Sequence, residues 1–268
     1  EVPLGFWRTW HELVRKVNPQ AYTVAEIWDH ASDFLQQGNF SATMNYHGFA
    51  FPIKGFLVDG VLTASDAARQ LDERRQDYPF AVQVALQNLI DSHDTDRVAS
   101  MIVNRGGENY LQPERFDYDV GERVSPRHWD RYDVRKPTDD ERRIQRLVAL
   151  MQMTFVGAPM IYYGTEAGMW GGDDPCDRMP MVWADLQYDP QKADPLGRPR
   201  EADEVKFDEK LHAYYDEAIR FRTRLPALRH GEIEFLHTDD SARFLAFRRW
   251  THDSQLLVAL NRGSNLYQ

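Results

Sequence analysis

The spacing of hydrophobic residues near the amino end predicts a helix followed by a short buried strand. Apolar side chains recur at helical spacing over residues 6–17, after Pro3 and before the helix-stopping pair Asn18-Pro19. The next apolar run, residues 22–28, predicts a strand that is buried on both faces and interrupted by Glu26 near its end. A carboxylate at that position needs a charged partner or a chemical role.

Helices and strands continue to alternate through the middle of the chain. Residues 41–46 predict a weaker strand, and Thr63 has the spacing of a capping residue for a helix that runs to residue 76. Residues 80–88 have a helical pattern and lead into a strand that ends at residues 89–92. Polar residues follow this strand end, as they follow the strand that contains Glu26.

Loops interrupt the next part of the chain. Residues 104–137 have no steady hydrophobic period and predict a long excursion of loops and turns. Thr138 then caps a helix whose apolar face extends to Phe155, and residues 159–163 predict the next strand. A second polar loop is predicted over 164–178.

The pattern changes near the carboxyl end. Residues 211–222 predict a last helix, and from Glu232 onward the apolar residues alternate with a period of two, which indicates antiparallel strands. We therefore place a domain boundary near Leu228, which divides the chain into residues 1–228 and 229–268.

The predicted order of elements indicates an α/β fold with parallel strands. Strands that alternate with helices form βαβ units, and the polar clusters follow three of the four predicted strands at their carboxyl ends. In a (β/α)8 barrel this edge carries the active site. Only about four such units are present, so we expect half of a barrel or an open sheet.

Composition and charge exclude several classes of protein. The 268 residues are 42% hydrophobic, which is enough for a sizeable core, and the net charge of −10 disfavours nucleic acid and anionic membrane surfaces as partners. No apolar run approaches the roughly 20 residues of a membrane-spanning helix. The single cysteine excludes an internal disulfide and a cysteine-rich zinc site, and it leaves the cellular compartment open.

Two carboxylates are the strongest candidates for chemistry. Glu26 and Asp94 each lie at the end of a predicted strand of one sheet, so both side chains are expected at one pocket. Glycosidic bond hydrolysis needs such a pair, and Trp28 and Tyr46 offer aromatic faces to sugar rings. Structural roles remain open: Glu26 as a buried partner of an arginine, Asp94 as a helix cap, and His93 as a partly buried structural histidine.

The motifs around these residues resemble the alpha-amylase superfamily, glycoside hydrolase family 13, and within it the neopullulanase, cyclomaltodextrinase and maltogenic amylase group. AEIW at residues 25–28 is similar to the block after the fifth barrel strand, and DSHDTDR at 91–97 to the block after the seventh. MNYHGF at 44–49 is similar to the sixth-strand segment, and the segment 157–183 resembles the eighth strand and its loop. The motifs occur in the family's order along essentially the whole chain.

This resemblance implies a role for each matched residue. Glu26 takes the role of general acid/base and Asp94 that of transition-state stabiliser, while His93, Asp174 and Arg178 take substrate-binding roles. It also implies that residues 1–228 are the carboxyl-terminal half of the catalytic barrel, strands five to eight. Residues 229–268 then correspond to the beginning of a β-sandwich domain.

The resemblance also has departures and gaps. Ala25, Asp91 and Thr165 differ from the usual family residues, and none of these changes removes a charge that the mechanism needs. The family's nucleophilic aspartate lies in an R-x-D block at the end of the fourth strand, and EVPLGFW resembles the segment directly after that block. We therefore expect the chain to be a fragment, inactive alone, of a longer enzyme. The superfamily's calcium ligands come mainly from the other half of the barrel, so the resemblance leaves calcium open for the complete enzyme and assigns no metal ligand to this chain.

The expected function of the complete protein is retaining hydrolysis of α-1,4-glucans, cyclodextrins or pullulan. A transglycosylase or isomerase of the same superfamily and a non-catalytic glucan-binding protein are the alternatives. An oligosaccharide or polysaccharide is the expected partner, and a homodimeric parent is compatible with the resemblance. Cytoplasmic and secreted or periplasmic locations both remain open.

Overall fold

The computed structural model describes residues 2–35, 38–106, 110–112, 115–116, 124–127, 129–264 and 266–267. Its helices are α1 (Leu4–Val17), α2 (Ser32–Leu35), α3 (Phe51–Ile53), α4 (Ala64–Gln76), α5 (Phe80–Gln83), α6 (Val98–Val103), α7 (Asp139–Thr154), α8 (Glu209–Arg224) and α9 (Pro226–His230), with π-helical turns η1 (Tyr46–Ala50) and η2 (Lys54–Val58) on either side of α3. Its strands are β1 (Val24–Ala25), β2 (Ala42–Thr43), β3 (Gln87–Asn88), β4 (Tyr110–Gln112), β5 (Arg115–Phe116), β6 (Ala158–Pro159), β7 (Gln191–Ala193), β8 (Pro199–Asp203), β9 (Glu232–Asp239), β10 (Phe244–Trp250) and β11 (Gln255–Asn261).

Four short parallel strands form the part of the fold that carries the candidate site. β1 pairs with β2, and β3 pairs with β6, both in parallel. An isolated parallel bridge between Met44 and Gln87 links the two pairs, so the spatial order β1-β2-β3-β6 follows the order along the chain. Helix α4 lies between β2 and β3 in the sequence, and α6 and α7 lie between β3 and β6. This arrangement agrees with the predicted parallel α/β alternation.

The region around β3 corrects one prediction. The helix expected over 80–88 ends at Gln83, and the strand begins at Gln87 rather than near residue 89. The backbone N–H of Ala158 donates to the Leu86 carbonyl at 2.7 Å, and that of Met160 donates to the Asn88 carbonyl at 2.9 Å. Pairing with β6 therefore overrides the local helical pattern.

Helix starts follow the predicted caps. The Thr63 side chain accepts from the backbone N–H of Asp66 at the start of α4. At α7, Thr138 and Glu141 form a complete capping box, and the Glu141 carboxylate also binds Arg105 and Arg135. These arginines hold the pKa of Glu141 well below its usual range.

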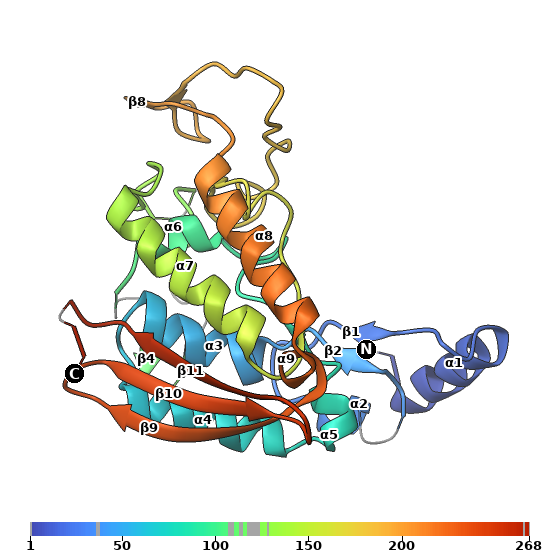
Figure 1. Cartoon of the computed structure of the whole chain (residues 1–268). Helices are drawn as coiled ribbons and strands as arrows, with labels where there is room; N and C mark the ends of the chain where they lie inside the picture. Colours follow the sequence, from blue (N-terminus) through green and yellow to red (C-terminus); the bar gives the residue numbers. More distant parts are fainter. Residues whose placement is uncertain are drawn as a thin grey trace.

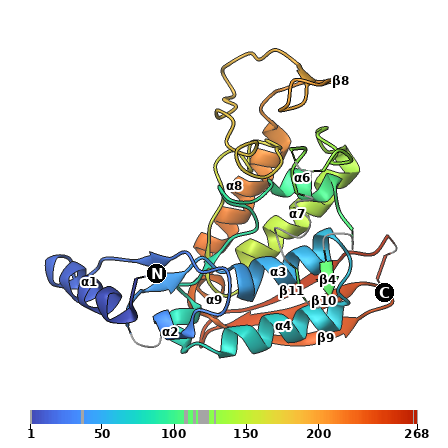
Figure 2. The same cartoon turned by 180° about the vertical axis from the view of Figure 1, so that it is seen from behind.

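The antiparallel strands after residue 232 form a sheet of order β11-β10-β9. This sheet lies along α4 and the lower end of α7 (Figure 1) and is seen from behind in Figure 2. Its inward side chains, such as Phe247 and Val258, belong to the same hydrophobic cluster as Leu71 of α4 and Val148 of α7. The division at Leu228 stays a prediction, and the sheet shares a continuous core with the preceding elements.

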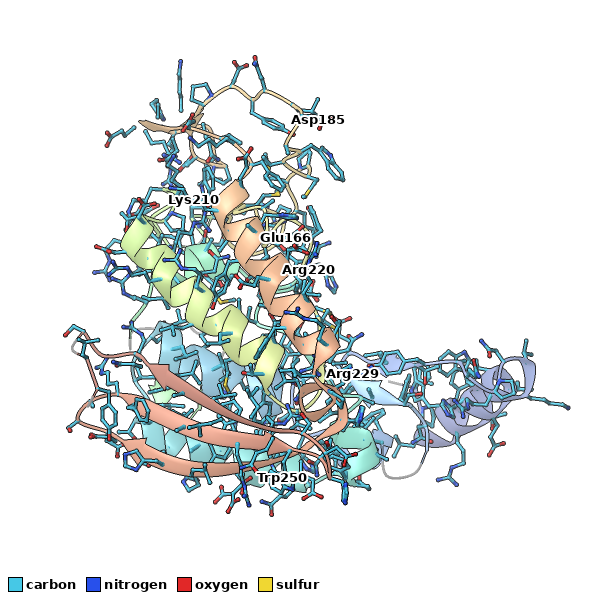
Figure 3. All side chains as sticks on the ribbon, viewed as in Figure 1. Glu166, Asp185, Lys210, Arg220, Arg229 and Trp250 are labelled. Carbon is cyan, nitrogen blue, oxygen red and sulfur yellow. The ribbon has the colours of Figure 1, made fainter. Side chains whose placement is uncertain are left out.

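Two buried arginines hold the end of α7 against this sheet and α8. Arg249 of β10 donates to the carbonyl oxygens of Thr154, Gly231 and Glu232, at 2.5, 2.8 and 3.1 Å. Arg222 of α8 donates to the carbonyl of Met153 in the last turn of α7 and to those of Phe155 and Gly157 just after the helix. Figure 3 shows Arg229 at the lower end of α8 and Trp250 at the lower edge of the sheet. Carbonyl oxygens left free at a helix end thus gain charged donors.

Three segments lie at the periphery of this body. Helix α1 has no buried residue and projects to one side, and the β7–β8 hairpin extends beyond the upper end of α8 (Figures 1 and 2). Strands β4 and β5 pair within the predicted loop 104–137, part of which lies outside the described residues. Among the helices that the structure describes, none has the length and apolar character that crossing a membrane requires.

Candidate active site

The two predicted carboxylates and the predicted histidine come together at the ends of parallel strands. Glu26 follows β1 directly, and His93 and Asp94 lie in the loop after β3. His93 Nε2 is 3.5 Å from Glu26 Oε1 and 3.4 Å from Asp94 Oδ2. The three side chains are 42%, 45% and 39% exposed, in the order Glu26, His93, Asp94, so a ligand has access to all three.

Arg178 adds a cation to this cluster. Its Nη2 donates to Asp94 Oδ1 at 2.9 Å, and its Nε lies 2.9 Å from both Asp174 Oδ1 and the His93 carbonyl oxygen. The loop after β6 thereby contributes the predicted pair Asp174 and Arg178 to the site. One guanidinium among three carboxylates leaves the cluster with an excess of acceptors, which suits a ligand rich in hydroxyl groups.

Tyr46 does not offer the aromatic face to a sugar that the sequence analysis expected. The rings of Trp28 and Tyr46 are stacked, with centroids 4.0 Å apart and an interplanar angle of 9°. Tyr46 is fully buried, and burial raises the pKa of its hydroxyl. It therefore presents no exposed face to a sugar and supports the partly exposed ring of Trp28 instead.

Ser92 joins the buried tyrosine to the loop that contains Asp94. The Tyr46 hydroxyl donates to Ser92 Oγ at 2.7 Å, and the same oxygen accepts the backbone N–H of Asp94 at 3.1 Å. The position of the Asp94 backbone is thus tied to η1, the element that follows β2. Sequence reasoning did not identify Ser92, although it lies within the motif at residues 91–97.

Arg97 is a second residue that the sequence analysis missed. It is fully buried, and its Nε and Nη1 donate to the carbonyls of Asp177 and Tyr163 at 2.8 and 2.6 Å. Its guanidinium also lies 4.5 Å from the Tyr162 ring centroid. Arg97 therefore joins the loop of Asp94 to the loop of Arg178. The sequence gives an arginine three residues after Asp94 but no sign that it is buried.

The loops that carry Asp94 and Arg178 also contain two buried carboxylates, Asp96 and Asp177. Burial raises the pKa of Asp177 to about 7. Burial also raises the pKa of Asp96 to about 8, and the Lys54 ammonium opposes that rise. The Tyr132 hydroxyl donates to Asp96 at 3.1 Å, and Lys54 forms a buried ion pair with Asp59 at 2.7 Å. A protonated Asp96 thus fits the low-dielectric interior at neutral pH.

The raised pKa of Asp96 predicts that the stability of the folded protein depends on pH. An aspartate in the unfolded chain ionises near pH 4, whereas folded Asp96 keeps its proton up to about pH 8, so the folded state binds more protons between these values. The stability that this proton contributes is complete below about pH 4 and is lost as the pH rises to about 8. We expect the free energy of unfolding, measured with urea, to fall less steeply between pH 5 and pH 8 in Asp96→Asn than in the wild type. The two slopes should differ by up to about 1.4 kcal/mol per pH unit.

The control for this prediction is Asp185→Asn, because Asp185 is exposed and has no burial to relieve. Its profile should run parallel to that of the wild type. A parallel profile for Asp96→Asn as well would contradict a protonated Asp96.

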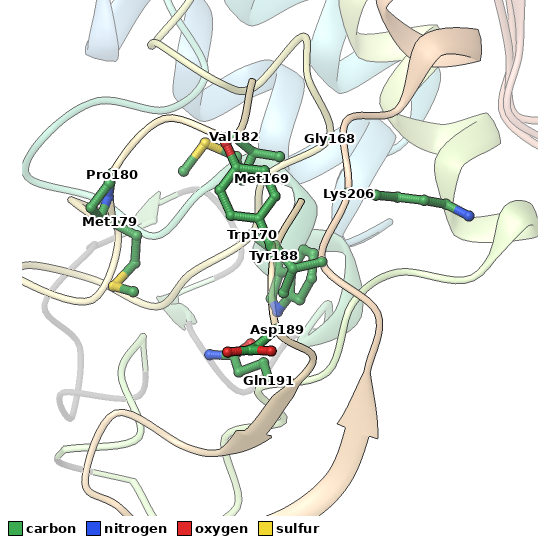
Figure 4. A pocket seen from close by; sticks show the side chains of 11 residues that line it. Gly168, Met169, Trp170, Met179, Pro180, Val182, Tyr188, Asp189, Gln191 and Lys206 are labelled. Atoms are coloured by element: carbon green, nitrogen blue, oxygen red, sulfur yellow. The ribbon is translucent and has the colours of Figure 1, made fainter. Parts of the chain in front are cut away.

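A separate cavity is lined by residues that surround Arg178 in the sequence, and none of the cluster's carboxylates lines it. It has a volume of about 410 Å³ and is lined by Trp170, Met179, Tyr188 and neighbours from 168–206 (Figure 4). The indole N–H of Trp170 donates to the Val134 carbonyl at 3.1 Å. The titratable side chains Glu26, His93 and Asp94 converge outside this cavity, so the candidate active site is that cluster and not the cavity.

Comparisons with known proteins agree with this geometry. Neopullulanase 2 of Thermoactinomyces vulgaris is 32% identical over 261 residues, which are 97% of this chain and 35% of that enzyme. A cyclomaltodextrinase of a Bacillus species is 29% identical over 97% of this chain and 37% of its own length. The chain is homologous to these α-glucan hydrolases. No protein-family model matches it.

Solved structures support the same relation. A cyclomaltodextrinase structure has a TM-score of 0.72 at 29% identity and matches 97% of this chain and 35% of its own. The cyclic α-maltosyl-(1→6)-maltose hydrolase from Arthrobacter globiformis has a TM-score of 0.72 at 25% identity over 98% of this chain. The resemblance to the neopullulanase, cyclomaltodextrinase and maltogenic amylase group is thus confirmed, and the chain spans about a third of the length of the curated relatives.

Proposed function

We propose that this chain supplies the acid/base side of the active site of a retaining hydrolase that acts on α-1,4-glucans, cyclodextrins or pullulan. The observation that carries the proposal is the convergence of Glu26, His93 and Asp94 within hydrogen-bonding or ion-pair range at one end of the parallel strands. The homology to enzymes named as neopullulanase and cyclomaltodextrinase supports the substrate class.

In this proposal Glu26 performs two proton transfers. It protonates the glycosidic oxygen as the bond breaks, while an aspartate from outside these 268 residues attacks the anomeric carbon and forms a covalent intermediate. Glu26 then takes a proton from the water that hydrolyses this intermediate. Its 42% exposure gives water a path to the carboxylate.

The remaining residues bind and orient the sugar. Asp94 accepts hydrogen bonds from sugar hydroxyls, and these bonds strengthen as the ring flattens toward the transition state. Arg178 fixes one oxygen of Asp94 at 2.9 Å and leaves the other oxygen facing the cluster. His93 and Asp174 bind further hydroxyls, and Trp28 stacks on a sugar ring.

The proposed architecture follows from the strand order. We assign β1, β2, β3 and β6 to strands five to eight of a (β/α)8 barrel, within residues 1–228. The sheet β9–β11 then begins a β-sandwich domain at about residue 229. The structural neighbours are barrel enzymes of the alpha-amylase family, and this chain covers about a third of the cyclomaltodextrinase structure.

The test uses the complete protein that contains this chain. It is incubated separately with a cyclodextrin, pullulan and a maltooligosaccharide, and the products are separated by chromatography. Hydrolysis predicts linear products with no more glucose units than the substrate and one new reducing end for each bond cleaved. Products longer than the substrate would identify a transglycosylase, isomeric products an isomerase, and binding without turnover a glucan-binding protein, each of which contradicts the proposal.

A further inference from the structure

The side chains of Glu26, His93 and Asp94 have the spacing of a transition-metal site. In the part of the chain that the structure describes, they form the one group of three or more histidine, cysteine and carboxylate side chains whose ligand atoms all lie within 4.8 Å of one another. A tetrahedral zinc ion with bonds of about 2.0–2.2 Å separates its ligand atoms by about 3.3–3.6 Å. The observed separations from His93 Nε2, 3.5 and 3.4 Å, fall in that range.

The donor atoms are also available for coordination. Arg178 occupies Oδ1 of Asp94, so Oδ2 is the oxygen that faces His93. The Arg178 Nε also donates to the His93 carbonyl, which fixes the backbone from which the imidazole projects. Each of the three side chains is about two-fifths exposed, so an ion enters the cluster without movement of the core.

We propose that Glu26 Oε1, His93 Nε2 and Asp94 Oδ2 bind one Zn²⁺ ion and leave its fourth position open to water. One imidazole nitrogen and two carboxylate oxygens are a set that zinc accepts, whereas Ca²⁺ requires six to eight oxygen ligands. An ion at this place occupies the carboxylate that we assign as general acid. The expected consequence, inhibition of glucan hydrolysis by zinc, rests on the proposed function, but the binding itself does not.

The direct test is calorimetric titration of this chain with zinc chloride in a buffer that does not coordinate metals. We expect one site per chain, and an affinity at least about tenfold lower in both His93→Gln and Asp94→Asn, because each loses one of three ligands. Calcium chloride should give no comparable binding. Cobalt(II) should give a visible absorption band typical of tetrahedral coordination, which a loosely held surface ion does not produce.

The matched control is His252→Gln. His252 lies 2.5 Å from the Asp253 carboxylate, with side chains 95% and 90% exposed, and among the residues that the structure describes this pair belongs to no group of three possible ligands. Zinc affinity should be unchanged in this variant, and circular dichroism checks that all variants keep the wild-type fold. Binding that survives His93→Gln, or equal binding of calcium, would overturn the proposal. Either result leaves the hydrolase assignment intact, because that assignment is tested by the turnover of the complete protein.

Discussion

Glu26→Gln in the complete protein is expected to lower kcat on a cyclodextrin by about 10²–10⁴-fold, with a modest change in KM. Glutamine has nearly the same shape as glutamate but cannot donate a proton to the glycosidic oxygen or accept one from water. Glu26 follows β1 directly and lies 3.5 Å from His93 Nε2, so the substitution removes the proposed proton-transfer group and keeps the surroundings. Steady-state kinetics with reducing-sugar detection measure the effect.

Glu217→Gln provides the matched control for this variant. Glu217 is an exposed residue of α8, remote in sequence from every residue of the cluster, and its replacement should leave kcat unchanged. Wild-type kcat in Glu26→Gln would remove Glu26 from the role of general acid. A loss of kcat that accompanies unfolding is recognised by a fall in the thermal midpoint, which we do not expect for a side chain that is 42% exposed.

The largest effect on stability is expected for Arg249→Ala. Arg249 is fully buried and donates to three backbone carbonyls. These are the carbonyl of Thr154 at the end of α7, that of Gly231 just before β9 and that of Glu232 at the start of β9. Truncation leaves these carbonyls without donors and creates a cavity, and we expect a loss of about 3–5 kcal/mol in the free energy of unfolding. Urea unfolding followed by circular dichroism measures this loss.

The adjacent Arg248 gives a control on the same strand. It lies on the other face of β10, where it pairs with Glu234 at 2.6 Å and is 38% exposed. Arg248→Ala should therefore cost about 1 kcal/mol or less, because exposed ion pairs contribute little. Equal losses in the two variants would show that the carbonyl contacts of Arg249 do not hold α7 to the sheet.

Much of the site could be predicted because its residues lie in short motifs at strand ends. A carboxylate that interrupts an apolar strand is visible in the sequence, and parallel strands bring their carboxyl ends to one edge. Glu26 and Asp94 are found together for this reason. The start of α7 was also predictable, because the capping box at Thr138 is a local signal.

The parts that could not be predicted depend on contacts between distant segments. Arg97 has the same local sequence whether its guanidinium is exposed or, as observed, donates to Tyr163 and Asp177. The burial of Tyr46 likewise depends on Trp28 and on Ser92, which lies 46 residues away in the sequence. Periodicity also fails where strand pairing decides the outcome, as at β3.

The most direct test of the account compares two substrates in Glu26→Gln of the complete protein. A maltosyl fluoride has a leaving group that departs without a proton, whereas a cyclodextrin needs the general acid. The account predicts that the variant still releases a burst of fluoride and forms the covalent intermediate, while cyclodextrin hydrolysis is lost. An equal loss of reaction with both substrates, or no loss with either, would contradict the assignment of Glu26 as the acid/base of a retaining hydrolase.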